Sequence, residues 1–212
     1  MAWGDPTISV RGVSLETRYA GPSPSEAPTL VLLHEGLGSA GLWRDFPERL
    51  SKATGFGVAA YSRAGYGQSD PVSLPRPLDY MTREATQVLP HFLDAIGFKR
   101  GLLMGHSDGA TIAAIYAGSI EDFRVRGTIL MAPHFFTEEL GLTEIARARQ
   151  AYATTDLRAR MAKHHRDPDN AFRGWNDAWL DPGFRSWNVG DVIDYFRLPT
   201  LAIQGRQDPY GT

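Results

Sequence analysis

Residues 101–115 read Gly-Leu-Leu-Met-Gly-His-Ser-Asp-Gly-Ala-Thr-Ile-Ala-Ala-Ile. The apolar run before the turn has the continuity of a strand buried on both faces, and the small apolar residues after it are typical of a buried helix. Between them lies the pattern Gly-x-Ser-x-Gly, which places a serine in a strained turn between a strand and the amino end of a helix. We therefore expect Ser107 to be a nucleophile.

Similar apolar runs recur along the chain without polar alternation, at 30–33, 57–61, 128–131 and 201–203. Such runs are typical of strands in a parallel sheet that is covered on both faces. Helical patterns separate them, and we expect Pro90 to kink one of these helices. The alternating pattern of residues 7–19 around Arg11-Gly12 predicts two short paired strands. Together these signals predict an α/β fold with a doubly wound, mostly parallel sheet.

The regular alternation of strands and helices is interrupted between residues 135 and 195, where the sequence consists mostly of short helical segments rich in Arg, Trp and Phe. We expect this segment to be a helical insertion that packs over the sheet as a cap. Residues 1–134 and 196–212 would then form one core domain.

Composition excludes several classes of function. The chain carries 22 Lys and Arg against 24 Asp and Glu, with no basic stripe, which argues against a nucleic-acid partner. It has no cysteine, which excludes a thiolate metal site and a cysteine nucleophile. No apolar stretch approaches the roughly 20 residues that a membrane span needs, and the first residues do not resemble a secretory signal. We expect a cytoplasmic protein that acts on a small molecule.

A second glycine-rich turn, His34-Glu35-Gly36-Leu37-Gly38-Ser39, directly follows the apolar run 30–33. Such a turn can direct a backbone N–H at the negative charge that develops on a substrate oxygen. We expect the N–H groups of Gly36 and Asp108 to form an oxyanion hole, with Asp108 contributing as the residue after the nucleophile. An ordinary strand-to-helix turn is the alternative interpretation of residues 34–39.

These motifs resemble the α/β-hydrolase superfamily, in its capped branch with a serine nucleophile. The segment Tyr61-Ser62-Arg63-Ala64-Gly65-Tyr66-Gly67-Gln68-Ser69 is similar to that branch's D-R-x-G-x-G-x-S turn, with Ser62 where aspartate is usual. The resemblance extends from about residue 7 to residue 208. It implies the α/β-hydrolase fold, no metal or organic cofactor, and a Ser-acid-His triad whose acid is Asp208 in a G-x-x-D turn. The alternative acid position, after the run 128–131, offers no carboxylate.

Two residues depart from the family pattern. Glu35 replaces a common glycine, and Asp108 places a carboxylate beside a proposed oxyanion donor, where its charge would oppose the developing negative charge. We expect both carboxylates to point away from the reacting centre or to be neutralised. An Asp108 side chain directed at the Ser107 hydroxyl would contradict this expectation.

The six histidines all precede Asp208, whereas in this fold the base follows the acid. The resemblance therefore implies that the triad histidine, a last strand and a last helix are missing from these 212 residues. We expect a nearly inactive chain with an exposed sheet edge that promotes association. His34 and His106 are expected to hold their loops, His91 to lie on a helix as a surface or core residue, and His164 and His165 to lie on a solvated face. His134 is a tentative substrate contact, with simple packing as the alternative.

The function that we expect is hydrolysis of a small carboxylic ester, thioester or activated C–C bond. The serine of the Gly-x-Ser-x-Gly turn, which is called the nucleophile elbow, stands where aspartate would be expected in the dehalogenase and epoxide-hydrolase branches, and this argues against both. One alternative is a C–C lyase or synthase similar to that of the menaquinone pathway. In that case arginines of the expected cap would hold a substrate carboxylate, and the alternative is that they are only solvated charges; these are Arg147, Arg149, Arg158 and Arg160. Another alternative is a binding module without turnover. The substrate and the oligomeric state are not predicted.

Overall fold

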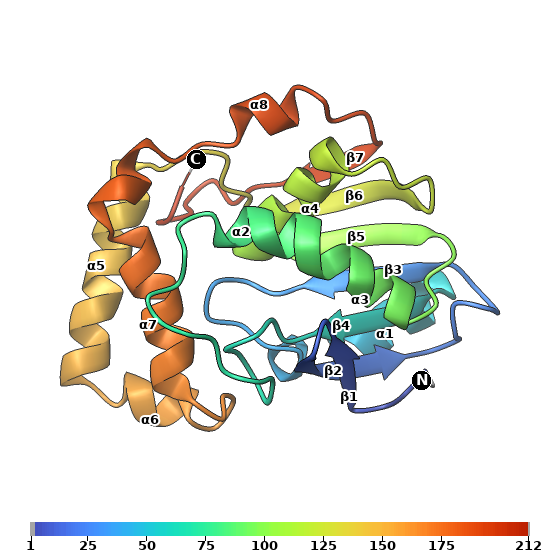
Figure 1. Ribbon diagram of the computed structural model, residues 1–212, viewed down its shortest axis with the longest axis horizontal. Coiled ribbons are helices and arrows are strands. Elements are labelled where there is room, and N and C mark those ends of the chain that lie inside the picture. The colour runs from blue at the N-terminus through green and yellow to red at the C-terminus, as the bar shows by residue number, and fades with distance from the viewer. Residues whose placement is uncertain (1–2, 212) are drawn as a thin grey trace.

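The computed structural model describes residues 3–211 and places helices on both faces of a central sheet (Figure 1). The strands are β1 (Thr7–Val10), β2 (Val13–Ala20), β3 (Thr29–Leu33), β4 (Gly57–Tyr61), β5 (Gly101–His106), β6 (Val125–Met131) and β7 (Thr200–Ile203). The helices of the core are η1 (Gly41–Trp43), α1 (Phe46–Thr54), α2 (Tyr80–Arg83), η2 (Glu84–Val88), α3 (Leu89–Ala95), α4 (Asp108–Ser119) and α8 (Gly190–Ile193). Between β6 and α8 lie α5 (Glu139–Thr154), α6 (Leu157–Met161), α7 (Pro168–Trp179) and η3 (Pro182–Ser186).

The seven strands form one sheet in the order β1-β2-β4-β3-β5-β6-β7. The two pairings of β2, with β1 and with β4, are antiparallel, and all pairings from β4 to β7 are parallel. The predicted doubly wound, mostly parallel sheet is therefore confirmed. At the β7 edge, Leu201 and Ile203 are 55% and 46% exposed. An exposed apolar edge is thus present, and association through it stays a prediction.

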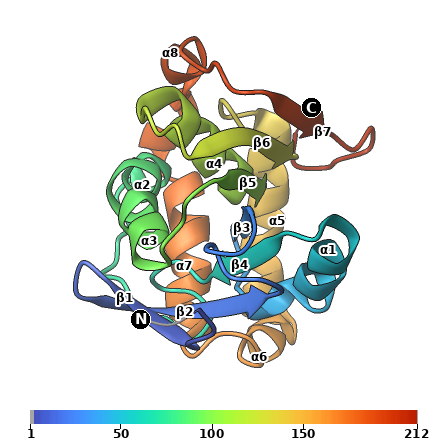
Figure 2. The same cartoon turned by 90° about the vertical axis from the view of Figure 1, so that its right-hand side faces the viewer.

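The continuous apolar runs are explained by layers on both sides of the sheet. In β3, Val31 and Leu33 face the cluster that contains α4, whereas Leu30 and Leu32 face the smaller cluster packed by α1. Figure 2 shows α1 on one side of the sheet and α2 and α3 on the other. A strand in this position needs apolar side chains at every residue, because neither face meets water.

The helix around Pro90 departs from regular geometry on its amino-terminal side. A π-helical turn at 84–88 links α2 to α3, and Pro90 lies in the first turn of α3, where its missing N–H needs no partner. Pro90 therefore lies at a position where a helix tolerates proline, directly after a π turn, and a kink caused by Pro90 itself stays a prediction.

The helices of the 135–195 segment divide into two groups. α5, α6 and α7 gather beside the carboxyl ends of the parallel strands, as Figure 1 shows. α8 lies against α4, so closely that a side chain at Gly118 would meet the Val192 carbonyl oxygen at 2.2 Å. The last part of the expected insertion thus packs on the core, and the role of α5–α7 as a cap stays a proposal. No helix within residues 3–211 is long and apolar enough to cross a membrane.

Candidate active site

Ser107 lies in a strained turn between β5 and α4. Its backbone has φ +52° and ψ −120°, a region that non-glycine residues seldom occupy. The two glycines of the motif permit close backbone approaches: a Cβ at Gly105 would lie 2.2 Å from the Gly109 carbonyl oxygen, and a Cβ at Gly109 would lie 2.0 Å from the Leu33 carbonyl oxygen. The spacing Gly-x-Ser-x-Gly is therefore required by the packing of β3, β5 and α4.

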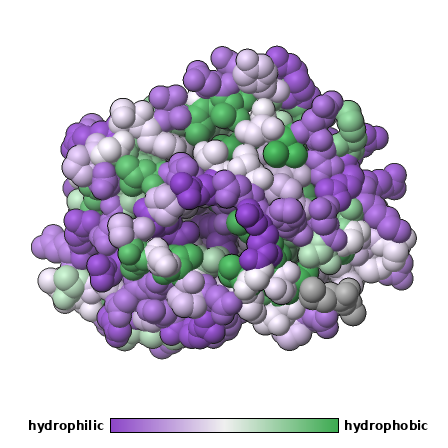
Figure 3. Space-filling model, viewed as in Figure 1, coloured by the Kyte–Doolittle hydropathy of each residue, from purple (hydrophilic) through white to green (hydrophobic). Residues whose placement is uncertain are grey.

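Ser107 borders a narrow cavity whose other walls come from the loop after β6, from α5 and α7, and from the tail after β7. These walls are formed by Asp108, His134, Glu138, Gly141, Ile145, Trp175, Trp179 and Tyr210. The space-filling view in Figure 3 shows that the face seen in Figure 1 is hollowed near its middle, with hydrophilic and some hydrophobic residues around the hollow. A serine at a helix amino terminus beside such a cavity can attack a bound carbonyl group.

His134 shares this cavity with Ser107. Its ring lies edge-on to Trp179, with 5.4 Å between the ring centroids. Burial lowers the pKa of His134, although the negative charges of Asp108, Asp208 and Glu138 act in the opposite direction. The imidazole is therefore mostly neutral at neutral pH and can accept a proton. Contact with substrate stays a prediction.

The turn after β3 packs its glycines against neighbouring side chains. A Cβ at Gly36 would lie 2.2 Å from Nε1 of Trp175, and a Cβ at Gly38 would lie 2.5 Å from the Glu35 carboxylate. Trp175 belongs to α7, so this helix forms a wall directly against the proposed oxyanion loop.

The two unusual carboxylates have separate partners. Glu35 Oε2 lies 3.7 Å from His106 Nδ1. Burial acts to raise the pKa of Glu35, but the neighbouring His106 and the positive charge of Arg63 outweigh it and lower the pKa. The proximity of Glu35 raises the pKa of His106. Glu35 thus lies beside His106, and its neutralisation stays a prediction.

Asp108 is fully buried, and its carboxylate is bound to Tyr80 rather than to Ser107. The Tyr80 hydroxyl donates to Asp108 Oδ2 and itself accepts a hydrogen bond from Trp179 Nε1 at 3.0 Å. Arg63 Nη2 lies 3.9 Å from the same carboxylate oxygen. The other oxygen, Oδ1, has no hydrogen-bond partner among residues 3–211. The contradicting geometry, a carboxylate directed at the Ser107 hydroxyl, is not found within these residues.

His165 corrects the sequence prediction of a solvated face. His164 is exposed as expected, but His165 is only 2% exposed. The Gly67 N–H donates to Nδ1 of His165 at 2.9 Å, so Nε2 carries the proton and donates to the Leu37 carbonyl at 3.1 Å. The ring therefore ties the segment between α6 and α7 to both turns beside the site. The one signal in the sequence for the burial of His165 is its position four residues after the apolar Met161, which is also buried.

This arrangement predicts a pH-dependent contribution of His165 to stability. Burial lowers the pKa of His165 in the folded protein. Below a pH of about 6.5 the unfolded chain therefore binds more protons at this residue, and the free energy of unfolding falls as the pH decreases. We expect the stability advantage of the wild type over His165→Gln to shrink between about pH 7 and pH 5 in urea unfolding. His164→Gln is the matched control, and identical pH dependence of wild type and His165→Gln would contradict the prediction.

Asp208 lies in the turn after β7, at the same end of the sheet. Its carboxylate accepts hydrogen bonds from the Tyr210 N–H at 2.9 Å and from Gln204 Nε2 at 3.3 Å. Its charge helps to raise the pKa of His106, and it acts against the burial that lowers the pKa of His134. Asp208 is therefore near the histidines of the site, and its role as the triad acid stays a proposal.

The arginines considered for a substrate carboxylate form ion pairs on the surface. Each has an acidic neighbour: Arg147 pairs with Glu144, Arg149 with Asp177, Arg158 with Asp169 and Arg160 with Asp156. This supports their interpretation as solvated charges.

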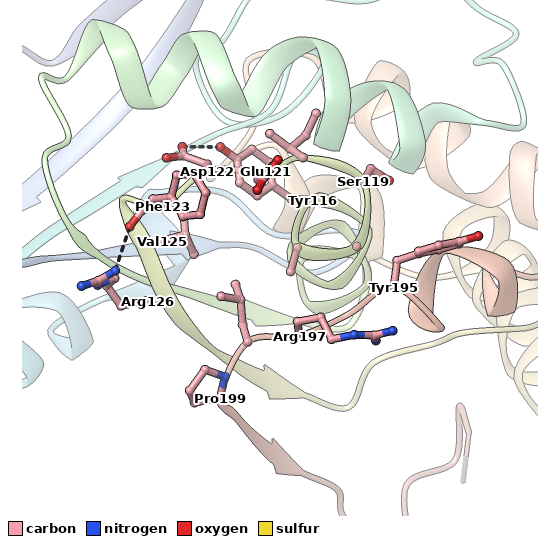
Figure 4. Close-up of a pocket in the computed structure, with 14 residues that line it drawn as sticks. Tyr116, Ser119, Glu121, Asp122, Phe123, Val125, Arg126, Tyr195, Arg197 and Pro199 are labelled. Carbon is pink, nitrogen blue, oxygen red and sulfur yellow. Dashed lines mark hydrogen bonds between the residues drawn. The ribbon is translucent and has the colours of Figure 1, made fainter.

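A larger groove of about 640 Å³ lies at the other end of the sheet (Figure 4). It is bordered by the end of α4, the start of β6 and residues 195–199. Of the two carboxylates that line it, Asp122 is already bound by Tyr116 and Arg124. Ser107 and Asp208 are far from it in the fold, since both follow the carboxyl ends of strands. Among residues 3–211, no group of three or more His, Asp or Glu side chains is placed to hold a metal ion.

Comparisons with known proteins agree with this geometry. The family model for the alpha/beta hydrolase fold matches residues 28–174. Serine hydrolase BPHL of Mus musculus is 26% identical over 95% of this chain and 69% of its own length. Epoxide hydrolase 3 of Xenopus tropicalis is 27% identical over 60% of this chain and 34% of its own length.

Solved structures share the fold at lower identity. A carboxylesterase structure from Nitrososphaera gargenis superimposes with a TM-score of 0.73 and 20% identity, covering 96% of this chain and 81% of that one. The enol-lactonase of Burkholderia xenovorans LB400 gives a TM-score of 0.68 and 19% identity, covering 95% and 81%. Because the family model matches more than half of the sequence, the chain belongs to the α/β-hydrolase family and is a hydrolase.

Proposed function

We propose that the protein hydrolyses a small carboxylic ester or thioester through nucleophilic attack by Ser107. The observation that carries this proposal is the strained Ser107 backbone at the amino end of α4, beside a cavity. Serine hydrolase BPHL and the carboxylesterase structure are consistent with this chemistry. The cytoplasmic location expected from the sequence stays a prediction.

The reaction has two steps. Ser107 Oγ adds to the substrate carbonyl carbon while a base takes the hydroxyl proton, and the N–H groups of Gly36 and Asp108 stabilise the oxyanion. Collapse of the tetrahedral intermediate expels the alcohol or thiol and leaves an acyl group on Ser107. Water then attacks this acyl-enzyme, releases the carboxylic acid and restores the serine.

The proposed reaction needs a base that accepts the proton of the Ser107 hydroxyl. No histidine follows Asp208 within these 212 residues, so a complete Ser-Asp-His triad in the usual order is not present among them. His134 lines the same cavity as Ser107, burial lowers its pKa so that the imidazole is mostly neutral, and the charge of Asp208 acts on it. We propose His134 as the proton acceptor that this chain offers, and we expect a low rate.

Carbon–carbon chemistry on a carboxylate substrate finds less support. The candidate arginines are engaged with acidic neighbours on the surface. Ester or thioester hydrolysis is therefore the better match.

Mass spectrometry after reaction with p-nitrophenyl acetate tests the proposal. This ester has a good leaving group and needs no general acid, so even a weakly activated serine should form an acyl-enzyme. We expect an acetyl group on the peptide that contains Ser107, and slower labelling in His134→Gln than in the matched variant His91→Gln. Ligand binding without any acyl-Ser107 would favour the binding module instead.

A further inference from the structure

The peptide group between Glu35 and Gly36 is held from one side by three donors. The Glu35 carbonyl oxygen accepts hydrogen bonds from His34 Nδ1 at 2.7 Å, from Arg63 Nη2 at 3.0 Å and from the Gly38 N–H at 3.1 Å. This peptide is trans, so its N–H points opposite to its carbonyl group. The Gly36 N–H is therefore fixed in the direction away from Arg63, and no acceptor for it is found among residues 3–211.

His34 contributes to this arrangement only in its neutral form. The Arg63 backbone N–H donates to Nε2 of His34 at 3.1 Å, so Nδ1 must carry the proton that is donated to Glu35. Burial, reinforced by the charge of Arg63, holds the pKa of His34 well below its usual value. The neutral tautomer is thus maintained across the neutral pH range.

Arg63 reaches both halves of the proposed oxyanion hole. Its side chain is 1% exposed, and its two terminal nitrogens donate to the consecutive carbonyl groups of His34 and Glu35. Nη2 also lies 3.9 Å from the carboxylate of Asp108, whose backbone N–H is the second proposed oxyanion donor. The guanidinium lies against the Tyr66 ring, 5.0 Å from its centroid. A planar fork with several donors can bind two neighbouring carbonyl groups in this way, and a lysine ammonium presents no such fork.

We propose that Arg63 is a positioning residue of the oxyanion hole: together with neutral His34 it fixes the Glu35–Gly36 peptide so that the Gly36 N–H faces the substrate carbonyl oxygen. This inference rests on the proposed ester hydrolysis at Ser107. Arg63 does not touch the substrate. It acts on the reaction through the direction of one N–H group and through its charge beside Asp108.

The test compares Arg63→Met and Arg63→Lys with the wild type on a p-nitrophenyl ester and on its thionoester. A thiocarbonyl sulfur accepts hydrogen bonds more weakly than a carbonyl oxygen, so a correctly directed Gly36 N–H favours the oxygen ester. We expect Arg63→Met to lower kcat for the oxygen ester about tenfold, a part of what one oxyanion donor contributes, with KM changed less than about threefold. The preference for oxygen over sulfur should fall in parallel, and Arg63→Lys should show the same change to a smaller extent.

Arg76→Met is the matched control, because Arg76 also lies over the Tyr66 ring but donates to the Ala64 carbonyl and not to the oxyanion loop. It should leave the oxygen-over-sulfur preference unchanged. Equal losses on both esters in Arg63→Met would mean a merely structural role and would overturn the inference. If Arg63→Met does not fold, the inference is tested on folded Arg63→Lys, in which the oxygen-over-sulfur preference must fall together with kcat. A wild-type rate in Ser107→Ala would instead refute the proposed function, and the inference with it.

Discussion

Ser107→Ala should reduce the hydrolysis of p-nitrophenyl acetate by about 100-fold or more, to the rate of the uncatalysed and surface-histidine reactions. The substitution removes the one hydroxyl that the elbow presents at the cavity, and no acyl-enzyme can then form at this position. It leaves the glycine contacts of the turn unchanged. Steady-state kinetics, with kcat and KM separated, is the measurement.

Ser119→Ala is the matched control for this loss, since Ser119 is an exposed serine at the other end of the same helix, α4. It should keep the wild-type rate. The thermal unfolding midpoints of the three proteins should agree to within a few degrees. If Ser107→Ala retains the wild-type rate, Ser107 is not the nucleophile and the hydrolysis must be assigned to another group.

Gly109→Ala should lower the free energy of unfolding by about 3 kcal/mol, even though alanine favours helices by about 1 kcal/mol over glycine. The added Cβ would lie 2.0 Å from the Leu33 carbonyl oxygen and 2.7 Å from the His34 carbonyl oxygen. Both atoms belong to the backbone at the end of β3, which is clamped between β4 and β5. α4 would have to move away from the sheet, and the oxyanion loop would move with it. Urea unfolding at neutral pH measures the change.

Gly190→Ala provides the comparison for a helical glycine with open space. Its added Cβ would have Asn188 Oδ1 as its nearest neighbour, at 3.7 Å. We expect stability to stay the same or to rise by up to about 1 kcal/mol. If Gly109→Ala behaves like Gly190→Ala, the close approach of α4 to β3 is not what requires glycine in the motif.

The strands and the nucleophile turn could be predicted because their signals are local. A strand covered on both faces must be apolar at every position, and residues 30–33 and 57–61 show this directly in the sequence. The Ser107 turn is equally local, since its two glycines and its serine fall within five consecutive residues. Helical periodicity identified the 135–195 segment as helical, but it could not show that α8 would leave α5–α7 and pack on α4.

The buried polar contacts of the site could not be predicted, because they join residues that are far apart in the chain. His165 meets Gly67 across 98 positions, and Trp179 meets Tyr80 across 99. A histidine in a polar stretch is read as solvated unless its partners are known, since burial of a polar ring is stable only when both nitrogens are hydrogen-bonded. The contacts of Arg63 with His34 and Glu35 could not be predicted for the same reason, since they span 29 and 28 positions.

The position of Trp175 gives the site an optical reporter of its own. Its indole is packed on Gly36 and, like that of Trp179, borders the same cavity as Ser107, so we expect a molecule bound beside the nucleophile to change the polarity around these two fluorophores. Indole emission can therefore report the occupancy of the cavity in stopped-flow or titration experiments without a chromogenic substrate. Candidate ligands can in this way be ranked on the unmodified chain before any turnover is measured.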